Sequence, residues 1–277
     1  MARAGPGDSQ TVEQLEKLMA KNRNSDQKQE LHRGSLELDS MMSNDDRANV
    51  KTPGSELEPV YTFRGHRSSI LSMDMSSTGE QFFAAHLNRI ICVWNVPSSN
   101  AEAHENYDSQ IPAEKFNGHS NVIWGLCYQS SFNRLISASP GKTLKIWQLG
   151  SGSDALIHTY TETDIGSPLT IDMVAAEPQQ IVAGYKNQCA SIFDIEVGRT
   201  VLKFDSNPDD EGQISKILSH PTMPVTIAAG SDRRIRYFVN NSGKLIHSTH
   251  VESISTLAID PNGLYLLSGC HDGSLRL

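Results

Sequence analysis

The residues Gly141-Lys142-Thr143, within the stretch SASPGKTLKIW, match the end of a phosphate-binding loop. In such a loop the lysine contacts the β- and γ-phosphates and the hydroxyl holds magnesium. The loop also needs a glycine five residues before Gly141, where this chain has Ile136. The alternative is a turn at Pro140-Gly141 between two short strands, the second being the alternating run TLKIW. The missing glycine favours the turn.

Cysteines and histidines are the other residues that could bind a metal or act in catalysis. The cysteines are isolated and form no CxxC pair, so we expect buried, reduced thiols rather than zinc ligands or a redox dithiol. They are Cys92, Cys127, Cys189 and Cys270. No nucleophile, base and orienting group occur together, and no histidine has a carboxylate or cysteine at ligand spacing. The sequence therefore predicts no catalytic residue, no metal and no cofactor.

The elements that would position any site repeat along the chain after residue 56. FRGHRSSILSMDMSSTGEQFFAAHLNRIICVW ends at Trp94, and FNGHSNVIWGLCYQSSFNRLISASPGKTLKIW aligns with it without a gap and ends at Trp147. Two looser copies close at Phe193 and Phe238, and a fifth stops at Leu277. Each copy contains short alternating apolar runs separated by turn signals such as SSTGE and DPNG, which predicts strands joined by turns.

A repeat of about 40 to 45 residues with a Gly-His near its start and a closing aromatic is typical of a WD-repeat β-propeller blade. We therefore predict an all-β propeller over residues 56–277, in which each blade buries the apolar faces of its neighbours. The blades should close near residues 94, 147, 193 and 238 and at the C-terminal end.

The WD-repeat resemblance implies a hydrogen-bonded set in each blade, made by a histidine, a turn aspartate, a strand serine and the closing tryptophan. Carried over by position, no copy has all four members, and the second has Gly141 instead of the aspartate. The structural residues expected from this are His66, His119, His250, Asn88, Asp232, Asp272, Ser137, Ser268, Trp94 and Trp147.

The same resemblance places the Gly-His loops and the turns before the third strands on one face, where partners commonly dock. By position this face carries Arg67, Ser69, Arg89, Asn121, Lys142, Arg233 and His271. Several of these side chains are basic although the chain has a net charge of -8. We expect the face to receive an acidic segment of a protein partner, with arginine forks pairing carboxylates. Ordinary solvated loop charges are the alternative.

Segments such as EPVYTFRGH, SHPTMPVTIAAGSDRRIRYF and LAIDPNGLYLLSGCHDGSLRL are similar to the propeller of the striatin family and include parts outside the WD consensus. The resemblance implies a non-catalytic scaffold that brings phosphatase 2A scaffold and catalytic subunits to germinal-centre-type kinases. It also implies calmodulin- and caveolin-binding segments, which are not recognisable here. The alternatives are a WD-repeat adaptor for another complex and a nucleotide-dependent enzyme. Because the family implies seven blades and five copies are visible, we expect a truncated propeller.

Residues 1–55 contain no aromatic residue and are rich in polar side chains, so we expect a mostly disordered arm. The run TVEQLEKLMAK predicts a short helix at 11–21, capped by Thr11. The mild acidity argues against nucleic acid as a partner. No run of about 18 apolar residues and no apolar signal segment occurs, so we expect no transmembrane segment and a cytoplasmic protein, membrane-associated only through partners.

Overall fold

The computed structural model describes residues 10–17, 63, 68–97, 111–161, 165–205, 212–250 and 253–277. The chain divides into two compact units, and the boundary before the strands falls between Thr62 and Phe63. In the first part of the chain, residues 10–17 form a helix. Thr11 lies inside this helix rather than before it, and residues 18–21 of the expected helix lie outside the described residues.

The strands of residues 63–277 form five antiparallel sheets, which we name A to E in chain order. This five-bladed arrangement confirms the predicted all-β propeller fold. Sheet A contains β1 (Ile70–Met75), β2 (Gln81–His86), β3 (Ile90–Asn95) and β4 (Glu114–Asn117). Sheet B contains β5 (Gly125–Gln129), β6 (Arg134–Ser139), β7 (Thr143–Gln148) and β8 (Leu156–Thr161). Short 3-10 helices occur at Ser130–Phe132 and Gly152–Asp154.

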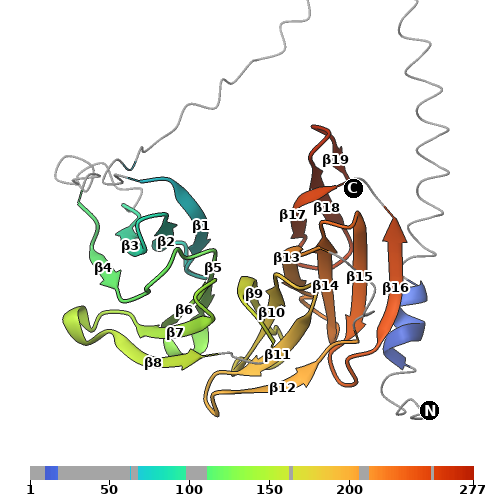
Figure 1. Ribbon diagram of the computed structural model, residues 1–277, viewed down its shortest axis with the longest axis horizontal. Helices are drawn as coiled ribbons and strands as arrows, with labels where there is room; N and C mark the ends of the chain where they lie inside the picture. Colours follow the sequence, from blue (N-terminus) through green and yellow to red (C-terminus); the bar gives the residue numbers. More distant parts are fainter. Residues whose placement is uncertain are drawn as a thin grey trace, which may run out of the picture. The chain divides into compact units, whose positions relative to one another are not determined.

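The later sheets repeat this order of strands. Sheet C contains β9 (Pro168–Met173), β10 (Gln180–Tyr185), β11 (Ala190–Asp194) and β12 (Arg199–Lys203). Sheet D contains β13 (Ile214–Ser219), β14 (Val225–Gly230), β15 (Arg234–Val239) and β16 (Leu245–His250). Sheet E contains β17 (Ile254–Ile259), β18 (Leu266–Cys270) and β19 (Leu275–Arg276). The sheets stack in chain order through their inner strands β1, β5, β9, β13 and β17 (Figure 1).

The core lies between neighbouring sheets. One cluster joins sheets B and C through side chains such as Ile136, Ile146, Ile171 and Ile181. Others join A to B and C to D. The closing aromatics are buried: Trp94, Trp147, Phe193 and Phe238 are each at most 3% exposed. The apolar positions of the alternating strands are therefore buried between neighbouring sheets, where each sheet covers the next.

Polar side chains of two inner strands also cap the backbone edge of the next inner strand. In sheet A, Asp74 accepts a hydrogen bond from the Tyr128 N–H in sheet B at 2.6 Å. In sheet C, Asp172 accepts one from the Ser219 N–H in sheet D at 2.8 Å. Burial raises the pKa of Asp172 to about 6, although these backbone bonds oppose the shift. These carboxylates satisfy edge N–H groups that no strand of their own sheet can pair.

The segment SHPTMP connects sheets D and E through His220. The His220 Nδ1 accepts hydrogen bonds from the Thr222 and Met223 N–H groups at 3.2 and 3.1 Å. Its Nε2–H therefore donates to the Gly263 carbonyl in the β17–β18 turn, at 3.0 Å. Burial lowers the pKa of His220 and keeps the ring neutral, as this pattern of bonds requires. The motif outside the WD consensus is thus a connection between blades.

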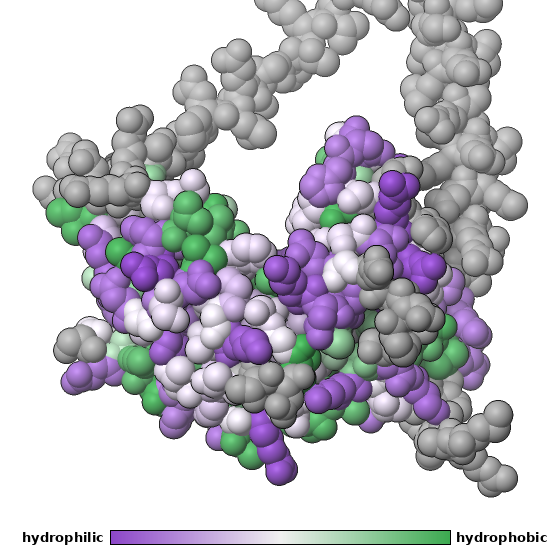
Figure 2. Space-filling model, in the orientation of Figure 1, coloured by the Kyte–Doolittle hydropathy of each residue, from purple (hydrophilic) through white to green (hydrophobic). Residues whose placement is uncertain are grey.

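The inner strand β1 differs from the others because it contains no buried residue. Ile70, Leu71, Met73 and Met75 are exposed, Met73 to 65%. Figure 2 shows apolar surface over this strand.

All four cysteines are free, as expected: Cys92, Cys127 and Cys270 are buried in strands β3, β5 and β18, and Cys189 is half-buried before β11.

Candidate partner-binding face

Sheet B contains a complete hydrogen-bonded set around the buried Ser137. The Trp147 Nε1–H donates to the Ser137 Oγ at 2.8 Å. The His119 Nε2 lies 2.7 Å from the same oxygen, and its Nδ1 lies 3.1 Å from the Thr143 Oγ1. Thr143 therefore fills the place of the aspartate that this copy lacks. Gly118 lies beneath the indole, since a Cβ there would be 3.1 Å from a Trp147 ring carbon.

The protonation state of His119 follows from its surroundings. Burial lowers its pKa to about 4, and the charge of Lys145 adds to the shift. The ring is therefore neutral at pH 7, with one donor and one acceptor nitrogen. If Ser137 donates to Nε2 and Nδ1–H donates to Thr143, every group of the set has a partner. In this arrangement the Ser137 hydroxyl accepts from the Trp147 indole and uses its own proton for His119.

The loop residues Gly141-Lys142-Thr143 lead into strand β7 and not into a helix. Ile136 is fully buried in β6, where a phosphate-binding loop needs glycine. The Thr143 hydroxyl is engaged by His119. The stretch is a turn between two strands, as the missing glycine had suggested.

The turn aspartates of sheets D and E use a different partner. Asp232 forms an ion pair with Arg236, four residues on in β15, and these side chains are 15% and 9% exposed. Asp272 pairs with Arg276 in the same way at 3.2 Å, and also accepts from the Ser274 hydroxyl at 2.6 Å. Burial is the largest single influence on the pKa of Asp232 and raises it, but the hydrogen bond and charge of Arg236, with smaller contributions from Gln188 and Arg234, together outweigh it and lower the pKa. Both aspartates tie their turn to the strand that follows.

The remaining structural residues form fewer contacts. Asn88 accepts a hydrogen bond from the Ile90 N–H at 3.3 Å. Ser268, which corresponds to Ser137, donates only a long bond of 3.5 Å to the Arg276 carbonyl. Trp94 stacks on Phe82 with ring centroids 6.1 Å apart. His66 and the side chain of His250 lie outside the described residues.

The turns between the second and third strands of all five sheets share one backbone conformation. One residue in each turn has a positive φ: 72° at Arg89, 59° at Lys142, 60° at Gln188, 65° at Arg233 and 81° at Gly273. Side chains other than glycine adopt this left-handed conformation at a cost of about 1 to 2 kcal/mol. Three of the five positions are nevertheless occupied by arginine or lysine.

Each of these turns, or in sheet B the end of the strand before it, is joined by a backbone hydrogen bond to the loop that leads into its own sheet, here called the leading loop. The backbone bonds run from Leu87 N to Ser69 O, Trp124 N to Ala138 O, Lys186 N to Ser167 O, Ser231 N to Gln213 O, and His271 N to Ser253 O. Arg89 also reaches the leading loop of sheet B, where its Nη1 donates to the Ser120 carbonyl at 3.3 Å. Turns and leading loops therefore lie along the same edge of every sheet, which we call the turn face.

Ser69, Arg89, Asn121, Lys142, Arg233 and His271 are all exposed on the turn face, whereas Arg67 lies outside the described residues. Lys186, which was not among the residues expected on this face, is exposed in the turn of sheet C at the position of His271 in sheet E. In the sequence, Lys186 directly precedes Asn187 as His271 directly precedes Asp272, so alignment of these two turns would have found it.

A hollow of about 180 Å³ opens where leading loops and inner strands meet on this face. It is lined by Leu71, Trp124, Leu169, Gln213, Ile214 and Ser215. Trp124 is 42% exposed, which places an aromatic ring at the mouth.

Within the described ranges, no three His, Cys, Asp or Glu side chains come together as a metal site. No helix in the same part of the chain has the length and apolar character needed to cross a membrane. The chemistry that the turn face offers is charge, hydrogen bonding and apolar contact.

Comparison with known proteins agrees with this architecture. The family described as "WD domain, G-beta repeat" matches residues 57–95, 111–148 and 243–277. Striatin from Homo sapiens is 38% identical over 233 residues, which are 82% of this chain and 30% of that protein. Striatin-3 from Rattus norvegicus is 36% identical over 82% of this chain and 29% of its own length, and Striatin-4 from Homo sapiens is 35% identical over 82% and 31%. The chain thus covers less than a third of these relatives. It is a WD40-repeat protein whose propeller segment belongs to the striatin family.

Proposed function

We propose that this chain is a scaffold or adaptor that uses its turn face to bind an acidic segment of a protein partner. The observation that carries the proposal is the placement of Arg89, Lys142 and Arg233 at positive-φ positions. Glycine fits such positions without steric cost, and sheet E has Gly273 there. Arginine or lysine at these positions makes the turns less stable than glycine would. We infer that these residues serve partner binding instead, because charged side chains on exposed loops can bind a partner.

The side chains at two of these positions are free for a partner. Lys142 and Arg233 form no side-chain hydrogen bond or ion pair with any described residue, whereas Arg89 bonds to Ser120. The Asp232 carboxylate next to Arg233 is occupied by Arg236. Lys142 and Arg233 therefore present uncompensated charge, which attracts carboxylates over distances of about 8 to 10 Å at physiological ionic strength.

The hollow at Trp124 supplies the second half of a binding site. Partner contacts gain most of their affinity from buried aromatic or aliphatic anchors, and the surrounding charges give selectivity and fast association. An acidic segment with one apolar anchor matches both features. His271 and Lys186 extend the same face to sheets E and C.

On the basis of its family, we further propose that the chain contributes to a complex of phosphatase 2A subunits with germinal-centre-type kinases. Binding of calmodulin or caveolin by segments elsewhere in such proteins belongs to the same proposal. An adaptor role in another complex remains the second candidate, because the turn face favours an acidic partner without naming it. The nucleotide-dependent enzyme is the weakest candidate, since Thr143 is held by His119 and β7 follows the turn.

The test is the double variant Lys142→Gly/Arg233→Gly of the full chain. Glycine removes the charge and also relieves the positive-φ cost, so we expect the free energy of unfolding to stay equal or rise by up to about 1 kcal/mol per site. Immobilised wild type and variant are compared for capture of proteins from cell extract at two salt concentrations. The variant should lose a subset of salt-sensitive partners.

The matched control is Lys115→Gln/Lys203→Gln, which removes the same charge from exposed positions on the outer strands β4 and β12. Equal recovery of every partner by wild type and the turn variant would refute the binding role of the turn face. If salt-sensitive partners are lost but phosphatase 2A subunits and kinases are never among them, only the assignment of the complex fails.

A further inference from the structure

The edge of the sheets opposite the turn face contains a hollow of about 300 Å³ between sheets C and D. Its lining includes the buried apolar side chains of Val174 and Ile192, together with Leu202 and Pro224. Val201, 53% exposed, lies on its wall. This volume is at the lower end of ligand sites, which suits one aliphatic side chain with a short stretch of backbone better than a cofactor.

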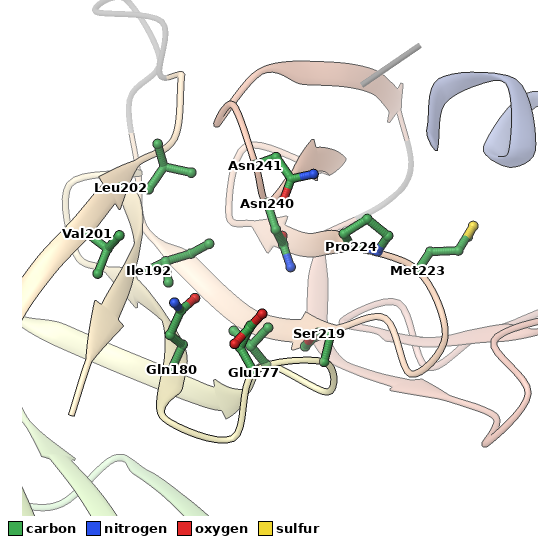
Figure 3. A pocket seen from close by; sticks show the side chains of 12 residues that line it. Glu177, Gln180, Ile192, Val201, Leu202, Ser219, Met223, Pro224, Asn240 and Asn241 are labelled. Atoms are coloured by element: carbon green, nitrogen blue, oxygen red, sulfur yellow. The ribbon is translucent and has the colours of Figure 1, made fainter. Parts of the chain in front are cut away.

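Polar side chains line the hollow as well. Glu177 from the β9–β10 turn, Gln180 at the start of β10 and Asn241 after β15 all line the hollow. Figure 3 shows Gln180 next to Ile192 and Val201, and Glu177 between Gln180 and Ser219. None of these three polar side chains forms a hydrogen bond or ion pair with a described residue. The site thus offers one unpaired carboxylate and two side-chain amides that can both donate and accept.

The amide of Asn240 fixes the position of this rim. Its Oδ1 accepts a hydrogen bond from the fully buried Thr226 hydroxyl at 2.7 Å. Its backbone N–H donates to the Pro224 carbonyl at 2.9 Å. On the other side, Ser219 donates its backbone N–H to Asp172 and accepts the Ala175 N–H through its Oγ. The walls of the hollow are therefore held from both sheets, so the site exists before a ligand arrives.

The charge of this edge is opposite to that of the turn face. The described turns at this edge carry one lysine, Lys244, against five carboxylates: Glu80, Asp154, Glu177, Glu196 and Asp260. Among the residues lining the hollow, Glu177 is the single charged side chain. A cation next to an apolar group is therefore the ligand that complements both the carboxylate and the apolar lining residues.

We propose that this hollow is a second docking site, which takes an extended protein segment with an aliphatic side chain beside a lysine or arginine. The aliphatic side chain fills the space over Ile192 and Leu202, and the cation pairs with Glu177. Gln180 and Asn241 bind backbone amides of the segment. This site stands apart from the turn face, so the chain can hold an acidic and a basic partner segment at the same time.

The experiment selects random twelve-residue peptides displayed on phage against the full immobilised chain. Counter-selection uses Ala176→Trp, which puts an indole into the hollow from an exposed lining position. We expect the enriched peptides to contain an aliphatic residue within two positions of lysine or arginine. One enriched peptide is then synthesised with a fluorescent label, and its Kd is measured by fluorescence polarisation.

Glu177→Lys should weaken this peptide at least about tenfold, because it replaces attraction by repulsion at a partly buried contact. Glu196→Lys, an exposed carboxylate of the same edge that does not line the hollow, should change the Kd less than about twofold. Lys142→Gly/Arg233→Gly should also leave it unchanged. The proposal is overturned if no peptide is enriched over the Ala176→Trp background, if the enriched peptides are acidic, or if Glu177→Lys binds as wild type does. Should Ala176→Trp fail to fold, selection against Glu177→Lys gives the same decision.

Discussion

Replacement of Ser137 by alanine tests the hydrogen-bonded set of sheet B. The Ser137 Oγ is fully buried and serves both the Trp147 indole N–H and the His119 Nε2. Ser137→Ala leaves those two buried groups without a partner, at a cost of about 1 to 3 kcal/mol each. The small cavity left by the hydroxyl adds little, so we expect the free energy of unfolding to fall by about 2 to 5 kcal/mol.

Urea unfolding followed by tryptophan fluorescence measures this change as a shift of the midpoint at constant slope. The matched control is Ser268→Ala at the corresponding place in sheet E, where one bond of 3.5 Å is lost. Its expected effect is below about 1 kcal/mol. If Ser137→Ala were as mild as Ser268→Ala, the set would not stabilise the blade and the assignment of His119 as a buried neutral ring would be wrong.

Two pH effects and one steric effect follow from the same structure. The pKa of His119 is lowered from 6.5 to about 4, so its contribution to the free energy of unfolding is present above pH 6.5 and is lost as the pH falls to about 4. The loss amounts to up to about 3 kcal/mol. A series of thermal melts against pH should show this loss in the wild type and not in His119→Gln, and an equal pH dependence in both proteins would contradict the prediction. The pKa of Asp172 is raised from 3.8 to about 6, so the pH dependence of its contribution to stability runs the other way: the contribution is present below pH 4 and is lost as the pH rises through 6. Asp172→Asn should remove this loss of stability between pH 4 and pH 6. The same pH dependence in variant and wild type would contradict the prediction. Gly263→Ala should lower the free energy of unfolding by at least about 2 kcal/mol more than Gly79→Ala. Both glycines have a φ of +74°, but a methyl group at position 263 would lie 2.2 Å from the His220 ring, whereas one at position 79 meets nothing within 4 Å. Equal urea midpoints for the two variants would show that His220 is not fixed in this position.

The strands could be predicted because the closing aromatics and the turn signals repeat at nearly constant spacing. Trp94, Trp147, Phe193 and Phe238 all lie in third strands, as the alignment indicated. The sequence copies do not coincide with the sheets, however. Phe116 begins the second copy but lies in β4, the outer strand of sheet A. Each copy therefore contributes to two neighbouring sheets, which joins them through the chain itself.

The parts that could not be predicted depend on side chains that substitute for one another in space. Thr143 replaces an aspartate expected at Gly141, and no spacing rule indicates that a hydroxyl two residues later reaches His119. The positive φ of Lys142 follows from the shape of the turn and not from its residue type, since lysine has no preference for that conformation. The hollow between sheets C and D combines residues from distant segments, of which Glu177 had no motif around it.

Because the cysteines are distributed over several sheets of the propeller, their rates of alkylation can report the local separation of individual sheets. Cys92, Cys127 and Cys270 are buried in sheets A, B and E, and burial raises the pKa of Cys92 and Cys127, so little thiolate is present to react. An alkylating reagent should therefore modify the half-buried Cys189 first and each of the others only when its own sheet separates from its neighbour. Mass spectrometry of the labelled peptides over time would give a separate opening rate for each of these blades, without any engineered probe.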